Sequence, residues 1–304
     1  MALDRRGLGM ISARVQVRPE YEKPLRAVLP LDDHDRMMTF SGGEEVGRNP
    51  RKVVRRIVCG AEGDGGVYYL KQAWHRGALD WMRAAMRSRG VRIVTDRERH
   101  MLALHRKAGI PVMQEVAWGR KALAGVPLSG FLVVQGVEGV DFAEAYHRIG
   151  ERERRDLMGA YGALVGSMHT RGLDALARTT DVFCVSDRYD DFTRAFVLID
   201  REWGALTLVP MPLKRRCNRL ATLFVKTRRW LGIPSGKEML SFLEAYLGAS
   251  PGLSMSADAL YREVSVDLAG REKDPCGGAH TRRRNGRERR QAVKDPARQK
   301  GDRP

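Results

Sequence analysis

The sequence has few cysteines and no long apolar run, and both absences limit what the protein can be. Its four cysteines are widely spaced in 304 residues and form no CxxC pair, which argues against a zinc site and against a disulfide framework. No window approaches the roughly 18 apolar residues that a membrane span needs, and residues 1–22 lack the apolar core of a secretory signal. We therefore expect a cytoplasmic protein, either free or peripheral at the inner membrane.

Acidic residues are also scarce relative to basic ones. The chain carries 54 Lys and Arg against 37 Asp and Glu, a formal net charge of +17. Residues 271–304 alone hold twelve basic and five acidic residues and few apolar ones, a composition that predicts a basic disordered tail. The positive charge favours anionic partners, such as a phosphorylated glycolipid, an acidic membrane surface, a nucleotide or a nucleic acid.

Residues 36–135 have the pattern of a small lobe built around a sheet. Apolar runs at 52–59 and 67–71, separated by the glycine-rich turn 62–66, predict a β-hairpin. A helix is expected over 96–108, because Gly109 and Pro111 follow it, and strands are expected over 112–119 and 130–136. Residues 1–35 are weakly periodic, so they predict an N-terminal arm or an edge strand.

Residues 136–270 predict a larger helical lobe. Residues 151–171 carry apolar side chains at the i, i+3, i+4 spacing of a buried helix. Two short strands are expected at 182–185 and 196–200, followed by helices over 213–230 and 237–247. The basic tail then begins at residue 271.

Three ionisable residues in these elements have protein-kinase spacing. Lys71 ends a strand-like run, Glu98 lies early in the helix 96–108, and Asp200 ends an apolar run of five residues. A strand lysine, a helix glutamate and a strand-end aspartate hold ATP and its magnesium in the kinase fold. The simpler interpretations are a surface lysine, an acidic residue in the first turn of a helix, and an aspartate in a turn.

With these residues, the chain resembles the bacterial lipopolysaccharide kinase family, the Kdo and core-heptose kinases, over roughly residues 40–248. The segments that carry the resemblance are 67–71, 97–112, 167–173 and 196–200, in that order. The resemblance implies an α+β, two-lobed protein-kinase-like fold with a small mixed sheet lobe containing one main helix, and a larger helical lobe. It also implies ATP and Mg²⁺ as cofactors, Lys71 and Glu98 as cofactor-binding residues, and Asp200 as a metal ligand.

The catalytic loop departs from the family pattern. When Met168 and His169 are matched to the family's Met-His pair, the aspartate that should accept the sugar hydroxyl proton falls on Ala177. The second metal ligand falls on Val182, and neither side chain can take a proton or bind a cation. Asp174 and Asp181 lie nearby as substitutes for the missing base. Asp174 is three residues early, and on an extended strand Asp181 would point away from the site.

Three further features bear on the site. The glycine-containing segment 41–47 is expected to cover the phosphates, but Glu44 and Glu45 within it would repel them. His169 is expected to be a buried, hydrogen-bonded core residue. Basic residues at 214–216, 226, 228 and 229, with Trp230, form either a solvated helix face or a docking surface for phosphorylated lipid.

The function that these patterns predict is ATP-dependent phosphorylation of a lipopolysaccharide core sugar or another anionic glycolipid, with a degenerate catalytic loop. One alternative is an inactive pseudokinase, a nucleotide-binding scaffold of lipopolysaccharide core assembly. A second alternative is a basic nucleic-acid-binding protein, but no nucleic-acid-binding motif supports it, and removal of residues 271–304 would distinguish it. Activity, acceptor sugar and oligomeric state do not follow from the sequence.

Overall fold

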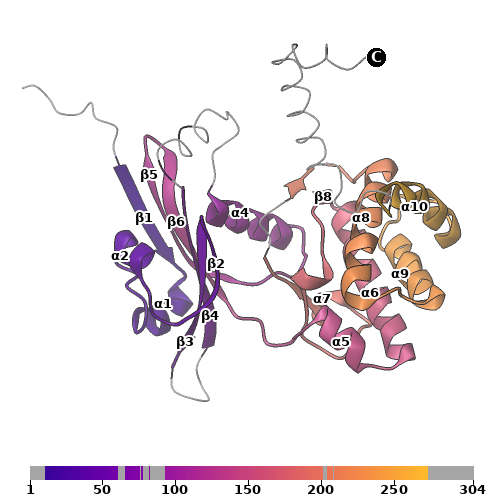
Figure 1. Ribbon diagram of the computed structural model, residues 1–304, viewed down its shortest axis with the longest axis horizontal. Helices are drawn as coiled ribbons and strands as arrows, with labels where there is room; N and C mark the ends of the chain where they lie inside the picture. Colours follow the sequence, from indigo (N-terminus) through magenta and orange to yellow (C-terminus); the bar gives the residue numbers. More distant parts are fainter. Residues whose placement is uncertain are drawn as a thin grey trace, which may run out of the picture.

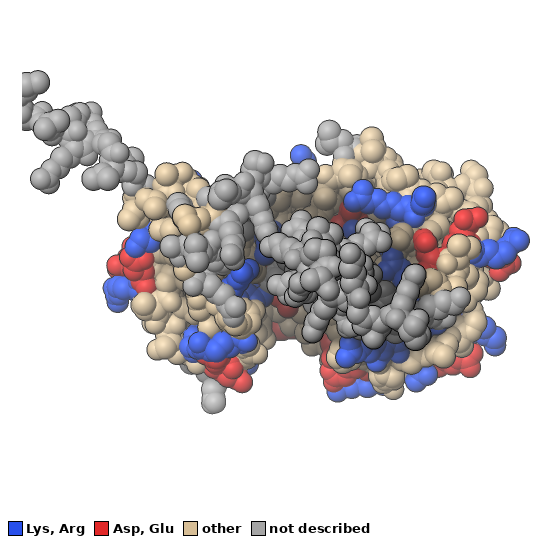
Figure 2. Space-filling view, turned by 45° about the horizontal axis from the view of Figure 1, so that its top comes forward, with Lys and Arg blue, Asp and Glu red and all other residues tan. Residues whose placement is uncertain are grey.

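The protein has two lobes, a sheet lobe and a helical lobe (Figure 1). The computed structural model describes residues 11–60, 66–75, 77, 82, 93–200, 204–207 and 209–272. On the face drawn in space-filling form, Lys and Arg side chains lie on both lobes, with Asp and Glu among them (Figure 2). The predicted basic tail lies outside the described residues from position 273 onward, as do residues 62–65 of the predicted hairpin turn.

The sheet lobe is built on six antiparallel strands in the order β1-β5-β6-β4-β3-β2. These strands are β1 (Ile11–Val17), β2 (Glu44–Asn49), β3 (Lys52–Cys59), β4 (Gly66–Trp74), β5 (Glu115–Leu123) and β6 (Val126–Gln135). Strand β4 lies between β3 and β6, so its backbone is hydrogen-bonded on both sides. A functional group on β4 is therefore carried by an interior strand of the sheet.

Helices cover both faces of this sheet (Figure 1). Side chains alternate between faces along each strand, and Leu70, Phe131 and Val133 pack in one cluster with residues of α1 (Pro19–Arg26) and α2 (His34–Thr39). Leu132 and Val134 pack on the opposite face with Leu102 of α4 (Val94–Lys107). Helix α4 lies on the side of the sheet that faces the helical lobe, so residues of that face can reach the space between the lobes.

The expected N-terminal arm, residues 1–35, folds over residues 11–35 as part of the sheet lobe. Of the two alternatives that the sequence allowed, an arm or an edge strand, β1 is an edge strand that pairs with β5. Leu25, Leu29 and Leu31 are buried in the core. The physical reason is that these leucines, although too sparse to give a clear period, cover apolar surface of the sheet that would otherwise face water.

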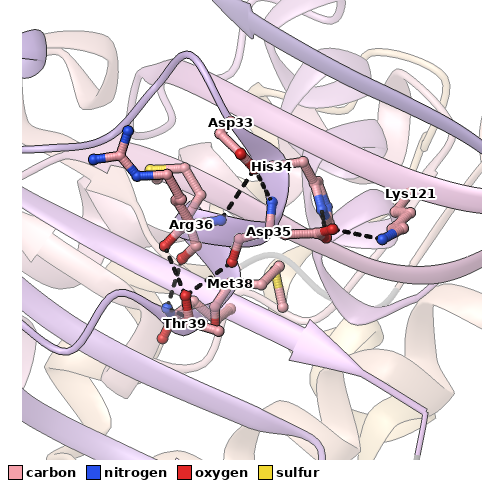
Figure 3. Close-up of polar contacts among 9 residues, drawn as sticks. Asp33, His34, Asp35, Arg36, Met38, Thr39 and Lys121 are labelled. Carbon is pink, nitrogen blue, oxygen red and sulfur yellow. Dashed lines mark hydrogen bonds and ion pairs between the residues drawn. The ribbon is translucent and has the colours of Figure 1, made fainter.

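Helix α2 is fixed to the sheet by the polar contacts drawn in Figure 3. The Asp33 carboxylate caps the helix by accepting hydrogen bonds from the backbone N–H groups of Asp35 (2.7 Å) and Arg36 (3.2 Å), a type of contact that stabilises a helix by about 1 kcal/mol. Asp35 then pairs with Lys121 of β5 at 2.6 Å. This exposed pair contributes little energy, but it orients α2 on the sheet.

The helical lobe is organised around α6 (Glu151–Thr170), which packs on α9 (Gly236–Gly248). Gly162 and Gly166 allow the two backbones to approach closely, because a Cβ at Gly162 would lie 2.0 Å from the carbonyl oxygen of Phe242. The other elements are β7 (Val140–Asp141), α5 (Phe142–Arg148), β8 (Leu173–Asp174), a 3₁₀ turn (Thr179–Asp181), β9 (Val182–Cys184), α7 (Phe192–Ala195), β10 (Phe196–Leu198), β11 (Ala205–Leu206), α8 (Leu213–Leu231) and α10 (Ala257–Glu272).

A short parallel bridge joins the two lobes next to the site. The backbone N–H of Met113 donates to the carbonyl of Leu198 at 3.0 Å, and the N–H of Leu198 donates to the carbonyl of Pro111 at 3.0 Å. The segment between α4 and β5 is thereby attached to β10. Because Asp200 follows β10 by two residues, this bridge fixes its position relative to the sheet lobe.

The strongest sequence patterns correspond closely to observed elements. The strand expected at 52–59 is β3, the helix expected at 151–171 is α6, and the helix expected at 96–108 is α4 with shifted ends. Helices α1, α2, α5, α7 and α10 and the two-residue strands β7, β8 and β11 were not predicted. Within the residues that the structure describes, no helix is both long and apolar enough to cross a membrane.

Candidate functional site

Lys71, Glu98 and Asp200 meet between the lobes. The Lys71 ammonium donates to Glu98 Oε1 at 2.5 Å and also contacts Asp200 Oδ1. Lys71 is 3% exposed and Glu98 is fully buried. Lys71 and Glu98 thus form a buried ion pair, and Asp200 pairs with the same ammonium group.

The electrostatics of this group follow from burial and opposite charge. Burial disfavours the ammonium form of Lys71, but the charges of Glu98 and Asp200 outweigh burial and raise the pKa of Lys71. Burial also disfavours the carboxylate of Asp200, but Lys71 outweighs it and lowers the pKa of Asp200. Lys71 is therefore charged near neutral pH, as a phosphate-binding group must be.

Lys71 and Asp200, but not the buried Glu98, line a cleft of about 410 Å³ between the sheet and residues of β9 and of the segment that follows β10. This volume is in the range of small-molecule sites. Apolar and aromatic side chains form much of its wall: Val46, Val54, Tyr69, Met113, Val134, Val137, Phe183 and Ile199. Such walls suit a planar aromatic group, and the ionic end suits phosphate.

The expected segment 41–47 reaches this cleft through Val46 and Gly47, and the β2–β3 hairpin adds residues that were not expected. Arg48, Asn49 and Lys52 line the cleft, together with Val46 and Gly47. The sequence did not single out Lys52; the signal that could have found it is the Asn-Pro turn between two strands, with a basic residue on each side.

The glutamates expected to repel phosphate are paired with arginines. Glu45 accepts two hydrogen bonds from Arg48, each 2.7 Å, and one from Arg55 at 3.1 Å. Glu44 lies 3.7 Å from Arg56. Neither glutamate lines the cleft, so the repulsion inferred from the sequence is largely removed by pairing within the hairpin.

The two positions where the catalytic loop departs from the family pattern lie in the core. Ala177 is 1% exposed, and its carbonyl accepts a hydrogen bond from the Tyr161 hydroxyl. Val182 is fully buried in β9, in the same apolar cluster. Neither side chain lines the cleft, so these positions supply packing and no polar group.

Asp174 is held by two arginines of α8. It pairs with Arg219 at 2.5 Å and also contacts Arg215. Burial disfavours its carboxylate, but Arg219 and Arg215 outweigh burial and lower the pKa of Asp174. A carboxylate held in this way is a weak base.

Asp181 and Asp200 line the same cavity, although the sequence predicted that Asp181 would point away from the site. Asp181 ends a 3₁₀ turn and does not lie on the extended strand that this prediction assumed. Both carboxylate oxygens accept hydrogen bonds from Arg178, at 2.7 and 2.8 Å. Asp181, Arg178 and Asp200 line a second cavity of about 210 Å³ together with Asp174 and Arg219.

The described side chains do not fit the two-ligand magnesium site that the resemblance implies. Asp200 Oδ1 is in contact with Lys71, both oxygens of Asp181 are bound by Arg178, and the second ligand position is Val182. In the described part of the chain, no group of three or more His, Cys, Asp or Glu side chains could hold a metal ion. Among the described residues, Asp200 is the one carboxylate that lines the cleft.

His169 is a buried core residue, as expected. Its Nδ1 lies 2.9 Å from the Tyr246 hydroxyl, and burial lowers the pKa of His169 to about 3. The predicted basic stripe does not form one surface. Arg216 is buried and donates to the Met211 carbonyl at 2.7 Å, whereas Trp230 is exposed.

Comparisons with known proteins give the family and a similar fold. Residues 44–220, more than half of the chain, match the model of the lipopolysaccharide kinase (Kdo/WaaP) family. A solved structure described as WaaP in complex with acyl carrier protein has a TM-score of 0.58 at 19% identity, covering 86% of this chain and 97% of that one. An aminoglycoside-3'-phosphotransferase of type VIII has a TM-score of 0.41 at 16% identity, covering 82% and 99%. No curated protein matches the chain.

Proposed function

Because the chain belongs to the lipopolysaccharide kinase (Kdo/WaaP) family, we propose that it binds ATP in the cleft between its lobes and transfers phosphate poorly or not at all. The observation that carries the proposal is the placement of Lys71 between Glu98 and Asp200 at the ionic end of an apolar cleft. Lys71 would contact the phosphates, Glu98 would orient Lys71, and the apolar walls would hold the base.

The impaired transfer follows from the catalytic loop. Phosphoryl transfer depends on positioning and electrostatics, and general base catalysis typically contributes about 10²–10⁴-fold in rate. Ala177 supplies no proton acceptor and Val182 no metal ligand, and both are packed in the core. Substrate binding and slow turnover are therefore compatible with this chain, and rapid turnover is not.

The acceptor, if the protein has one, would be a lipopolysaccharide core sugar or another anionic glycolipid. This extends the family assignment, and the net charge of +17 favours such a partner. A protein of this kind would work in the cytoplasm, free or at the inner membrane surface. The pseudokinase role, a nucleotide-binding scaffold of core assembly, needs the same cleft without turnover.

One observation favours residual turnover as a second candidate. Asp181 shares a cavity with Asp200, so it is placed where an acceptor hydroxyl could approach. Its pairing with Arg178 would have to open before Asp181 accepted a proton. Asp181→Ala would then abolish a slow activity that Asp174→Ala leaves in place.

The test of the proposed function is calorimetric titration of the full chain with ATP, followed by phosphate release in the presence of core oligosaccharide. We expect weak but measurable binding, and its loss in Lys71→Ala. Lys107→Ala, which removes an exposed lysine at the end of α4, is the matched control. Brisk phosphorylation of core oligosaccharide by the unmodified chain would refute the impaired transfer.

A further inference from the structure

The charges that line the cleft are unusual for a site expected to use a metal ion. Of the residues that the structure describes, three cationic side chains line it, Arg48, Lys52 and Lys71, and one carboxylate, Asp200. Lys71 already contacts that carboxylate, and Val182 occupies the place of a second ligand. A nucleotide polyphosphate here would meet side-chain cations and few oxygen ligands for a divalent ion.

Lys52 is, with Arg48, one of two cations on the cleft that the resemblance does not account for. It is the first residue of β3 and pairs with Ala73 of β4. Val54, two residues further on the same face of the strand, pairs with Lys71 and also lines the cleft. The side chain of Lys52 is therefore on the same face of the sheet as Lys71, one step nearer the β2–β3 turn.

The effect of the Lys52 charge on the two nearby carboxyl groups supports this placement. Its charge contributes to lowering the pKa of Asp200 and opposes the effect of burial on Glu98. Lys52 is therefore near enough to both carboxylates for its charge to act on them. Arg48 donates two hydrogen bonds to Glu45, so part of its charge is already neutralised within the hairpin.

We propose that this cleft binds the polyphosphate of a nucleotide without a divalent cation, and that the Lys52 ammonium supplies positive charge that a metal ion would otherwise bring. The proposal rests on the proposed function, since it concerns the same cleft and the same ligand class. It adds Lys52 as a binding residue and nucleotide binding without a divalent cation, and the family assignment provides neither.

The experiment is calorimetric titration of the full chain with ATP and with AMP, once in excess Mg²⁺ and once in EDTA. The chain is compared with Lys52→Gln, with Lys52→Arg, which keeps the charge, and with the control Lys107→Gln. We expect ATP affinities in Mg²⁺ and EDTA to agree within about threefold. Lys52→Gln should weaken ATP binding in EDTA by about tenfold or more and weaken AMP binding much less. Lys52→Arg, which keeps the charge, should bind ATP about as well as the unmodified chain.

The possible results separate this inference from the proposed function. Binding of ATP that requires Mg²⁺ would overturn the inference while the proposed function stands. Unchanged binding by Lys52→Gln in EDTA would overturn the role of Lys52. Absence of ATP binding in both conditions, with a normal melting transition of the chain, would overturn both proposals.

Discussion

Replacing Lys71 by Met should separate the structural role of the ion pair from its role in binding. The change leaves Glu98 buried without its charged partner, and removal of one partner from a buried pair typically costs about 3–5 kcal/mol of the free energy of unfolding. For a domain of this size, that corresponds to a fall in melting temperature of roughly 6–20 °C. The double variant Lys71→Met with Glu98→Gln removes the unpaired charge, so it should recover much of the stability and none of the ATP binding.

The pH dependence of the single variant gives an independent check. Burial is the largest influence on Glu98 and favours its protonated form, so loss of Lys71 should raise the pKa of Glu98. A group whose pKa is raised by folding stabilises the folded state at low pH and loses that contribution as pH rises through the folded pKa. The stability deficit of Lys71→Met should therefore shrink as pH is lowered from about 8 to about 5.

Thermal and urea denaturation of the two variants, at both pH values, measure these effects. Lys107→Met is the control and should change stability by less than about 0.5 kcal/mol. If Lys71→Met were as stable as the unmodified chain near neutral pH, the buried ion pair would not have the energetic role described above. Recovery of ATP binding in the double variant would contradict the assignment of Lys71 to the phosphates.

Three other changes test the fold and the catalytic loop. The catalytic-loop residues that the sequence lacks could be restored by combining Ala177→Asp with Val182→Asn. This double variant should instead lower the melting temperature and leave turnover low, because both sites are buried in the apolar core. A gain in turnover would refute this. Gly162→Ala should destabilise the chain by about 1–3 kcal/mol, since its Cβ would lie 2.0 Å from the α9 backbone. Gly248→Ala is the control and should not destabilise it, because there is open space around Gly248. Urea denaturation measures the stability of both variants. Truncation after residue 272 should leave the melting temperature within a few degrees, because residues 273–304 are predicted to be a dispensable tail.

The sequence by itself determined the elements whose patterns are local. The strand 52–59 and the helix 151–171 follow from periodicity and from the residues that end them. It also indicated Lys71, Glu98 and Asp200, because each lies at a recognisable place in such an element. Helices α1 and α2 were missed, since their few buried apolar residues have no clear period and gain their order from the sheet that they cover.

Only the tertiary structure decided how these residues meet. Lys71 and Asp200 are 129 positions apart, and their contact depends on the bridge between the lobes. The position of Asp181 depends on a 3₁₀ turn, and the presence of Lys52 in the cleft depends on the register of β3 against β4. The physical reason is that side-chain chemistry is encoded locally, whereas the distance between two charges is set by packing of elements that are remote in the chain.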